Sequence, residues 1–445
     1  MEMPDAVVVG AGYAGLCAAR RLRTAGLDVL VLEASDRVGG RTLTARLPGG
    51  WALDLGGQWI APAHTRFAAL ARAYDAKTFT GHTQGDNVLV SQTSHRRFSG
   101  RLPPLPPHAT AVLALALWKL DRLTTRTLTT AQAERLDSTT VATWLRRRLP
   151  VPQAHRLAEA ILGAELSVDV ASVSMLALIT AIRGTGGVRA GTEAETTASL
   201  FVDGADGPAR SIAAELGDAV RLDTPVTSIH DTGDDVHIAG VRAARAIVAL
   251  PPPLAGRIHY TPALPAARDQ LTQRTPMGAA LKTCAVYDTP FWRGDGLSGL
   301  ALDLDGPMTL DASRPGGPGL LCTLANGPAA RRLTRLDPAE RKATIVRSLV
   351  RGHGPRAAHP VDWHEKNWSD DPYCRGGYNA YFPPGVLTTV GPALRTPVGR
   401  VHWAGSETAT EWAGYIEGAI RSGERAADEV LQAETRFRDR LVVPD

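Results

Sequence analysis

Cysteine is scarce in this 445-residue sequence. The four cysteines, Cys17, Cys284, Cys322 and Cys374, are scattered and form no C-x-x-C pair. This usage argues against a disulfide scaffold or a zinc site and suits a reducing compartment. Histidines and carboxylates also lack the paired spacing that is typical of metal ligands. We therefore predict a cytoplasmic protein without a metal centre.

Long hydrophobic runs are lacking too. The longest, Ala109 to Trp118, is far shorter than the roughly 20 apolar residues that span a bilayer. The first strand-like run starts almost at Met1 with no signal peptide before it, and the last residues form a charged tail. We therefore expect no membrane partner.

Charge of one sign is not in large excess, because 49 lysines and arginines face 45 aspartates and glutamates, a net charge of +4. The longest basic run is Arg146 to Arg148, and no aromatic residues alternate with it. Such a run is more typical of a solvated helix face than of a nucleic-acid surface, so we expect no nucleic-acid partner. The G-x-S-x-G pattern of a serine nucleophile is also absent, which argues against hydrolase chemistry of that kind.

The sequence does contain a βαβ pattern at its start. Ala6 to Val9 is a β-branched run that predicts a buried strand, and an apolar stripe of Leu16, Ala19 and Leu22 follows at helical spacing. Val29 to Leu32 predicts a second strand. This order of elements is the setting in which a glycine-rich turn binds a dinucleotide.

The turn itself carries G-x-G-x-x-G at Gly10, Gly12 and Gly15, and Glu33 follows the second strand. Gly10 permits the tight turn, Gly12 lets a pyrophosphate approach the backbone, and Gly15 lets the helix pack closely on the strand. The helix N-terminus favours the phosphate charge. Glu33 can accept hydrogen bonds from the adenosine ribose hydroxyls, which favours FAD or NAD over a 2′-phosphorylated cofactor.

The next residues distinguish between these dinucleotides. Arg37, Gly39, Gly40 and Arg41 form R-x-G-G-R directly after the ribose acid. A second glycine pair indicates a second close backbone approach to the same pyrophosphate, whose charge Arg41 would neutralise. The run resembles the extended FAD signature of glutathione-reductase-type flavoproteins.

The following part of the chain changes character several times. Trp51 to Leu55 predicts a strand, residues 80 to 107 a surface connection that is polar and then proline-rich, and residues 109 to 183 a helical region. Gly184 to Gly191 predicts a glycine-rich loop, and short strands return between residues 211 and 250.

Later segments complete the predicted fold. Residues 278 to 365 combine strands with a long helix at Pro338 to Gly352, and Val401 to Ala404 predicts a strand before a C-terminal helix over Gly414 to Gln432. We predict an α/β fold in which a Rossmann-like FAD-binding domain of the glutathione-reductase type is assembled from discontinuous segments, with an α+β substrate domain of mixed sheet and helices between them. The FAD-binding segments are 1–80, 204–277 and 390–445, the last with the C-terminal helix, and the substrate segments are 81–203 and 278–389.

Four further stretches carry a family resemblance. They are Asp54–Trp59 (DLGGQW), Gly278–Lys282 (GAALK) with Tyr287 and Phe291–Trp292 after it, Lys366–Trp368 with Gly376–Tyr378 and Tyr381–Gly385 after it, and Ala404–Gly418 (AGSETATEWAGYIEG). Together with the N-terminal fingerprint they resemble the flavin-containing amine oxidases of the monoamine oxidase family, from about residue 5 to 432. The chain is most similar to soluble bacterial members, since it lacks the C-terminal membrane tail of others.

This resemblance implies an aromatic cage made by Tyr378 and Tyr415 in front of the flavin. A substrate amine would pass between the rings, so that its α-carbon lies by flavin N5. Aromatic faces attract an amine nitrogen and orient it at little entropic cost. Lys282 would lie beside N5 and hold a water, where a fixed cation stabilises negative charge on the reduced flavin or on superoxide. Without the resemblance, each tyrosine is more typical of ordinary core.

The resemblance also implies which residues hold FAD. Gly405, Ser406 and Glu407 would contact its ribityl-phosphate part where the last helix begins. The whole predicted cofactor set is Gly10, Gly12, Gly15, Glu33, Arg41, Gly56, Gly57, Gln58, Trp59, Val226, Trp368, Gly405, Ser406 and Glu407.

Three departures from the family pattern matter. Some members attach FAD through a cysteine just before the cage tyrosine, but that position here is Gly377, so we predict non-covalent FAD. The stretch that often carries Gly-Gly-x-Gln reads Glu195–Phe201, and the turn Asp203–Pro208 after it is altered, which puts the substrate cavity in question. Trp59 follows Gln58 where amino-acid oxidases often have an arginine nearby, which disfavours an amino-acid substrate.

The predicted function is oxidation of a neutral amine. Its α-carbon loses a hydride equivalent to flavin N5, the imine hydrolyses to an aldehyde and ammonia, and oxygen is reduced to hydrogen peroxide. Alternatives are an amine dehydrogenase with another acceptor, oxidation or desaturation of a specialised biosynthetic amine, and a purely structural flavin. The joint presence of Lys282, Tyr378 and Tyr415 argues against the last. A homodimer is the oligomeric state that the resemblance suggests.

Overall fold

The computed structural model of the chain describes residues 3–91, 94–100, 102–196 and 198–442. A five-stranded parallel sheet brings together strands from three distant stretches of sequence, in the order β10, β2, β1, β14, β21. These strands are β1 (Ala6–Val9), β2 (Val29–Leu32), β10 (Val220–Arg221), β14 (Arg245–Val248) and β21 (Val401–Trp403). Both faces of the sheet are covered, which explains why β1 and β2 are apolar at every position.

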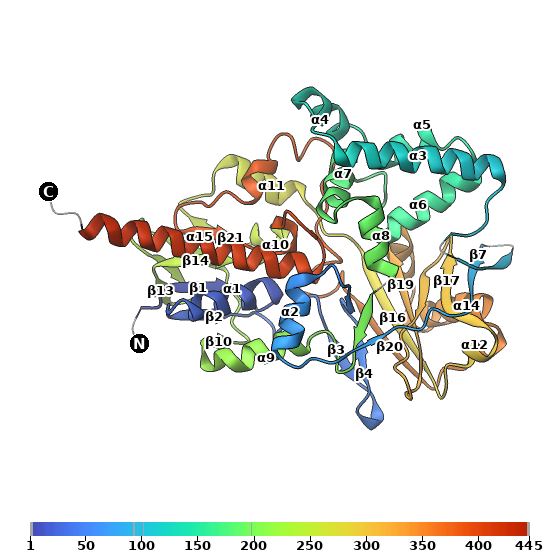
Figure 1. Cartoon of the computed structure of the whole chain (residues 1–445). Helices are drawn as coiled ribbons and strands as arrows, with labels where there is room; N and C mark the ends of the chain where they lie inside the picture. The colour runs from blue at the N-terminus through green and yellow to red at the C-terminus, as the bar shows by residue number, and fades with distance from the viewer. Residues whose placement is uncertain (1–2, 92–93, 101, 197, 443–445) are drawn as a thin grey trace.

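The two faces carry different layers (Figure 1). Ala6 and Val8 belong to the core under three helices, α1 (Tyr13–Thr24), α9 (Gly207–Leu216) and α15 (Ile416–Val442). Val7 and Val9 point the other way, because side chains alternate along a strand, and they pack against a small sheet. That sheet has the order β13, β12, β11, β15 and contains β11 (Ser228–Asp231), β12 (Val236–Ile238), β13 (Val241–Ala243) and β15 (His259–Thr261).

A second large sheet has seven strands in the order β20, β16, β19, β18, β17, β7, β8. Its pairings are antiparallel except for β17 with β7. The strands are β7 (Asp86–Val90), β8 (His95–Phe98), β16 (Ala280–Tyr287), β17 (Leu297–Asp303), β18 (Met308–Asp311), β19 (Gly319–Asn326) and β20 (Asp362–Asn367). Helices α12 (Phe291–Gly294) and α14 (Pro338–His353) pack on it.

Six helices form a separate layer with its own core, on the side of the molecule away from both termini (Figure 1). They are α3 (Pro107–Thr125), α4 (Thr130–Asp137), α5 (Val141–Arg148), α6 (Pro152–Leu166), α7 (Met175–Gly184) and α8 (Val188–Thr196). Among the described residues, none of the helices combines the length and the apolar character that crossing a bilayer requires.

Short elements connect these layers. They are β3 (Thr44–Arg46), β4 (Ala52–Asp54), β5 (Trp59–Ile60), α2 (Thr65–Ala73), β6 (Thr78–Thr80), β9 (Ser199–Phe201), α10 (Pro252–Ala255), α11 (Ala266–Arg274) and α13 (Gly327–Leu333). Strands β3 and β4 pair with each other, and β9 lies between β5 and β6.

Three sequence-based expectations were wrong. Residues 80 to 107 include the hairpin β7–β8, because Val88 and Val90 become buried against β17, about two hundred residues later. The expected loop Gly184–Gly191 is mostly helical, and only residues 185–187 separate α7 from α8. Helix α15 continues to Val442 through the charged tail, which contains three arginines, and arginine is a good helix former.

Candidate cofactor and substrate site

The first glycine turn leaves an open backbone face at the N-terminus of α1. Gly10 has a φ of 99°, which favours glycine, and a Cβ on Gly15 would lie 1.9 Å from the Gly10 carbonyl oxygen. A Cβ on Gly12 would meet nothing nearer than the Gly40 Cα at 3.9 Å. This geometry fits the predicted roles, in which Gly15 allows close packing and Gly12 lets a phosphate approach the helix.

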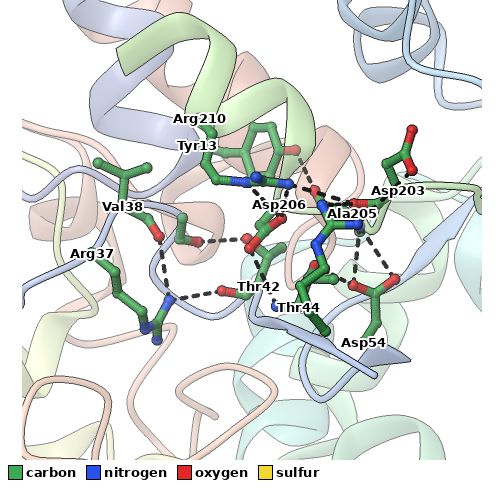
Figure 2. Close-up of polar contacts among 12 residues, drawn as sticks. Tyr13, Arg37, Val38, Thr42, Thr44, Asp54, Asp203, Ala205, Asp206 and Arg210 are labelled. Carbon is green, nitrogen blue, oxygen red and sulfur yellow. Dashed lines mark hydrogen bonds and ion pairs between the residues drawn. The ribbon is translucent and has the colours of Figure 1, made fainter. Parts of the chain in front are cut away.

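The second glycine pair lies against the first turn. The Gly39 N–H donates to the Ala11 carbonyl at 2.9 Å. Arg37 holds this loop in shape, since its guanidinium donates to the carbonyls of Val38, Gly40 and Thr42 (Figure 2). The R-x-G-G-R run therefore brings a second stretch of glycine backbone beside the first.

Glu33 is buried directly after β2. Its carboxylate accepts hydrogen bonds from the N–H groups of Ala11 at 2.6 Å and Ser35 at 2.9 Å. Burial raises its pKa, and these hydrogen bonds oppose the shift. Val226 packs against the core under the same sheet. Glu33 thus lies where β2 ends, the edge at which parallel sheets bind nucleotides.

Arg41 and Glu407 form a buried ion pair that the sequence did not predict. The Arg41 guanidinium lies 2.7 Å from Oε1 of Glu407, and it also donates to the Tyr378 carbonyl at 2.6 Å and the Ser406 hydroxyl at 3.2 Å. Glu407 accepts from the Ala380 N–H at 3.0 Å as well. Burial by itself would raise the pKa of Glu407, but Arg41 and these hydrogen bonds hold it below its usual value. The pair ties the glycine loop to the chain around Tyr378.

Replacing Arg41 with glutamine should therefore destabilise the fold by about 3–5 kcal/mol, because it leaves a buried carboxylate without its partner. Denaturant unfolding of the FAD-free protein measures this change. Arg20→Gln is the matched control, since Arg20 pairs with Glu215 on the surface and should cost no more than about 1 kcal/mol. Equal losses in the two variants would contradict the assigned role of the Arg41–Glu407 pair.

Lys282 is buried in β16, with 3% of its surface exposed. Its ammonium donates to the Gly56 carbonyl at 3.0 Å and to Oε1 of Gln58, and lies 5.4 Å from the centre of the Trp59 ring. Trp368 donates from its indole N–H to the Leu55 carbonyl at 2.9 Å. The structure therefore brings together the predicted lysine and the Gly56–Trp59 run.

The altered turn 203–208 contacts the chain segment that follows the second glycine pair. The Asp54 carboxylate accepts hydrogen bonds from the Thr44 hydroxyl and the Ala205 N–H. The Asp206 carboxylate accepts a hydrogen bond from the Thr44 N–H and forms an ion pair with Arg210 (Figure 2). Burial raises the pKa of Asp54 to about 6, against the effect of Lys282. The turn was expected beside the substrate cavity, but its contacts are with the fold under the cofactor loops. The preceding stretch runs from 195 to 201, of which residue 197 lies outside the described residues, and β9 pairs with β5 at Trp59.

Tyr378 and Tyr415 are each held by neighbours. The Tyr378 N–H donates to the Ser167 hydroxyl at 2.6 Å, and its ring packs beside Ala280, Trp368 and Cys374. Burial raises the pKa of Tyr378. The Tyr415 ring meets Trp412 edge-on at 5.3 Å and His64 at 5.7 Å between ring centres.

Four residues at this site were missed by sequence reasoning. Glu165, at the end of α6, accepts the Tyr415 hydroxyl at 2.6 Å, and Ser167 anchors Tyr378. Asn326 and His64 are buried beside the two tyrosines, and no local pattern marks either of them. Glu165 and Ser167 follow an ordinary amphipathic helix, so only the fold reveals their position.

Because the His64 imidazole is buried, we expect the protein to lose stability in acid. Burial lowers its pKa to about 4, with Glu417 opposing the shift and Arg421 adding to it. A folded state that resists protonation loses stability as the pH falls from about 6.5 towards 4, by up to about 3 kcal/mol. In His64→Phe, which keeps an aromatic ring against Trp412, this part of the pH dependence of unfolding should vanish. His95→Phe, at an exposed position on β8, should retain it, and an unchanged profile in His64→Phe would contradict the assignment.

Comparison with known proteins shows the family of the chain. The family model described as flavin containing amine oxidoreductase matches residues 13–431. The chain is 35% identical over 447 residues to an L-amino acid dehydrogenase of Synechocystis sp., covering 96% of this chain and 94% of the relative. It is 33% identical to a probable flavin-containing monoamine oxidase A of Dictyostelium discoideum, covering 96% and 97%.

A solved structure shows the same fold. Cyclohexylamine oxidase from Brevibacterium oxydans superposes with a TM-score of 0.91 at 33% identity, over 98% of this chain and all of that chain (100%). The mixed α/β fold thus matches that of flavin amine oxidases, and the resemblance seen in the sequence is confirmed. The chain belongs to the flavin-containing amine oxidoreductase family, a family of oxidoreductases whose cofactor is FAD.

Proposed function

We propose that the chain oxidises the carbon next to the nitrogen of a neutral amine, giving an imine and then an aldehyde and ammonia, with oxygen reduced to hydrogen peroxide. The observation that carries this proposal is the junction at Arg41. One guanidinium contacts both the Tyr378 backbone and Glu407, so the loop predicted to hold the pyrophosphate and the predicted cage tyrosine form one unit. A substrate held at Tyr378 would therefore be held in register with the cofactor.

The sheets support a proposal for the domain assignment. We propose that segments 1–80, 204–277 and 390–445 form a Rossmann-like FAD-binding domain, and that 81–203 and 278–389 form the substrate domain. The parallel sheet with helices on one face and a small sheet on the other supports this, as do the glycine turns at its carboxyl edge.

The FAD is proposed to be non-covalent. The residue before Tyr378 is Gly377, and burial raises the pKa of the Cys374 thiol to about 12, so the thiol is a poor nucleophile. Acid precipitation of the yellow protein should leave all of the flavin in the supernatant.

The chain itself binds and orients the substrate. Bound FAD supplies the two-electron acceptor. Tyr378 and Tyr415 would hold the amine nitrogen between their faces, and Lys282 would supply a fixed positive charge near the reacting atoms. No side chain needs to act as a base if the amine arrives neutral, so the rate of reduction should rise with pH until the substrate has lost its proton.

Anaerobic mixing tests the proposal. The protein with FAD bound is combined with diamines, polyamines, aromatic and aliphatic monoamines and amino acids, and the flavin absorbance is followed. Bleaching by amines, with colour returning quickly when oxygen is admitted, is the expected result. If dithionite bleaches the flavin but no amine does, the proposal is wrong.

A dehydrogenase is the second candidate, because the Synechocystis relative is an L-amino acid dehydrogenase. Slow return of colour in oxygen but fast return with an artificial electron acceptor would favour it. Bleaching by amino acids would also show that Trp59 does not prevent binding of a carboxylate. We further propose that the protein is cytoplasmic and forms a homodimer. Analytical ultracentrifugation tests the oligomeric state.

A further inference from the structure

A surface groove of about 380 Å³ lies between α3 and α5, in the helical layer on the side away from both termini (Figure 1). Two tryptophans, one leucine and four cationic side chains line it, namely Trp118, Lys119, Arg122, Leu123, Arg126, Trp144 and Arg148. We call these residues, together with Leu115, the α3–α5 face. Its function is not accounted for by amine oxidation.

The α3–α5 face exposes large apolar side chains to solvent. Helix α3 buries Leu113, Ala116 and Leu120 in the core of its layer. Its other side exposes Leu115 by 51% and Trp118 by 52%, which lie one helical turn apart. Single exposed apolar residues are ordinary, but two large ones on one stripe, beside the two indoles of the groove, indicate a surface that meets a partner.

The same face is strongly cationic. Four positive side chains, Lys119, Arg122, Arg126 and Arg148, line the groove. Within the described residues, none of the four forms an ion pair. Arg122 lies over the Trp118 ring at 5.0 Å. These charges are therefore available to an anionic partner.

We propose that the α3–α5 face binds the anionic surface of a lipid bilayer. Leu115 and Trp118 would enter the headgroup region, while the arginines and Lys119 contact lipid phosphates from their flexible stems. A nucleic acid would use the cations and stack on the indoles, but it has no use for Leu115, which lies outside the groove. A small anion in the groove would leave the same leucine exposed. The contact is peripheral and needs no membrane-spanning segment, so it differs from the expectation of no membrane partner, which rested on the lack of a long apolar run. It does not depend on the proposed reaction.

Vesicle co-sedimentation of the full chain with FAD bound tests this proposal. The vesicles are phosphatidylcholine alone, or phosphatidylcholine mixed equally with phosphatidylglycerol. We expect binding only to the mixture, weakening as salt is raised. Each positive charge near an anionic membrane contributes about 1 kcal/mol, or roughly fivefold, so Arg122→Gln with Arg148→Gln should weaken binding about 25-fold. Leu115→Ser with Trp118→Ser should weaken it at least about tenfold.

Matched controls lie on the other side of the chain. Arg23→Gln, in the last turn of α1, removes a charge, and Leu222→Ser removes a leucine that is 38% exposed. Neither should change binding by more than about twofold, and all variants should unfold at the same denaturant concentration. The proposal is overturned if the wild type ignores anionic vesicles at low salt, or if the face variants bind like the controls. A third result would also overturn it. In that result, duplex DNA or an aromatic sulfonate displaces the protein from the vesicles completely, and the double variant Leu115→Ser with Trp118→Ser binds vesicles as tightly as the wild type.

Discussion

Replacing Lys282 with methionine should slow the reaction of the reduced protein with oxygen by about 10²–10³-fold. Reduction by an amine under anaerobic conditions should change far less, because we propose that the cation acts where negative charge develops on the flavin and on oxygen. Stopped-flow absorbance measures the two half-reactions separately. A loss confined to the oxidative half-reaction is the expected signature.

The physical basis is the setting of Lys282. Its ammonium is almost completely buried and is held by the Gly56 carbonyl and the Gln58 side chain, beside Trp59. A positive charge stabilises a nearby negative charge more strongly in such a dry site than in water. Because the ammonium is already held in place, the protein does not have to reorganise during the reaction. Methionine keeps much of the length of the stem and removes only the charge and its hydrogen bonds. The two oxygens left without a donor should cost about 1–3 kcal/mol each in stability.

Lys366→Met is the control. Lys366 is the register partner of Lys282 on the neighbouring strand β20, and its ammonium pairs with Asp371 at 2.7 Å. This variant should lose some stability but keep the normal rate with oxygen. Equal slowing in both variants would show a general effect on the sheet, and an unchanged rate in Lys282→Met would contradict the assigned role.

Replacing Tyr415 with alanine should lower kcat/KM for the amine by about 10²-fold, since a misplaced substrate costs that much. Tyr415→Phe should lose only a few-fold, because the ring and its edge contacts with Trp412 and His64 remain. Steady-state kinetics with the best amine of the panel gives both values.

The hydrogen bond between Tyr415 and Glu165 gives a second test of the effect expected for Tyr415→Phe. The tyrosine hydroxyl donates to Glu165, so Glu165→Gln and Tyr415→Phe both weaken one contact and should have similar effects. Tyr373→Ala, at an exposed tyrosine on the surface, should leave the kinetics unchanged. If Tyr415→Ala and Tyr415→Phe were equally active, the cage would have no role in catalysis.

The N-terminal site could be predicted because its determinants are local. Gly10, Gly12 and Gly15 act through backbone geometry within one turn, and the strand before them and the helix after them are encoded by their own periodicity. The structure accordingly shows β1, α1 and β2 where the pattern placed them. Lys282 and the two tyrosines came from longer motifs, whose meaning depended on a resemblance.

Contacts between distant residues could not be predicted in this way. Arg41 was expected to meet only the pyrophosphate, but its guanidinium pairs with Glu407, 366 residues later. The hairpin β7–β8 was read as a surface connection, since its valines become core residues only when β17 lies beside them.

The sequence by itself thus determined the glycine turn and the elements β1, α1 and β2 around it, because glycine geometry and short-range periodicity specify these locally. It also indicated the family, through the long motifs that carry the resemblance. Only the tertiary structure decided that Glu165 holds Tyr415, that Arg41 joins the loop of the second glycine pair to Tyr378, and that Trp118 of α3 and Arg148 of α5 line one groove. Each of these depends on packing that brings separate helices and loops together, and such contacts leave no local pattern in the chain.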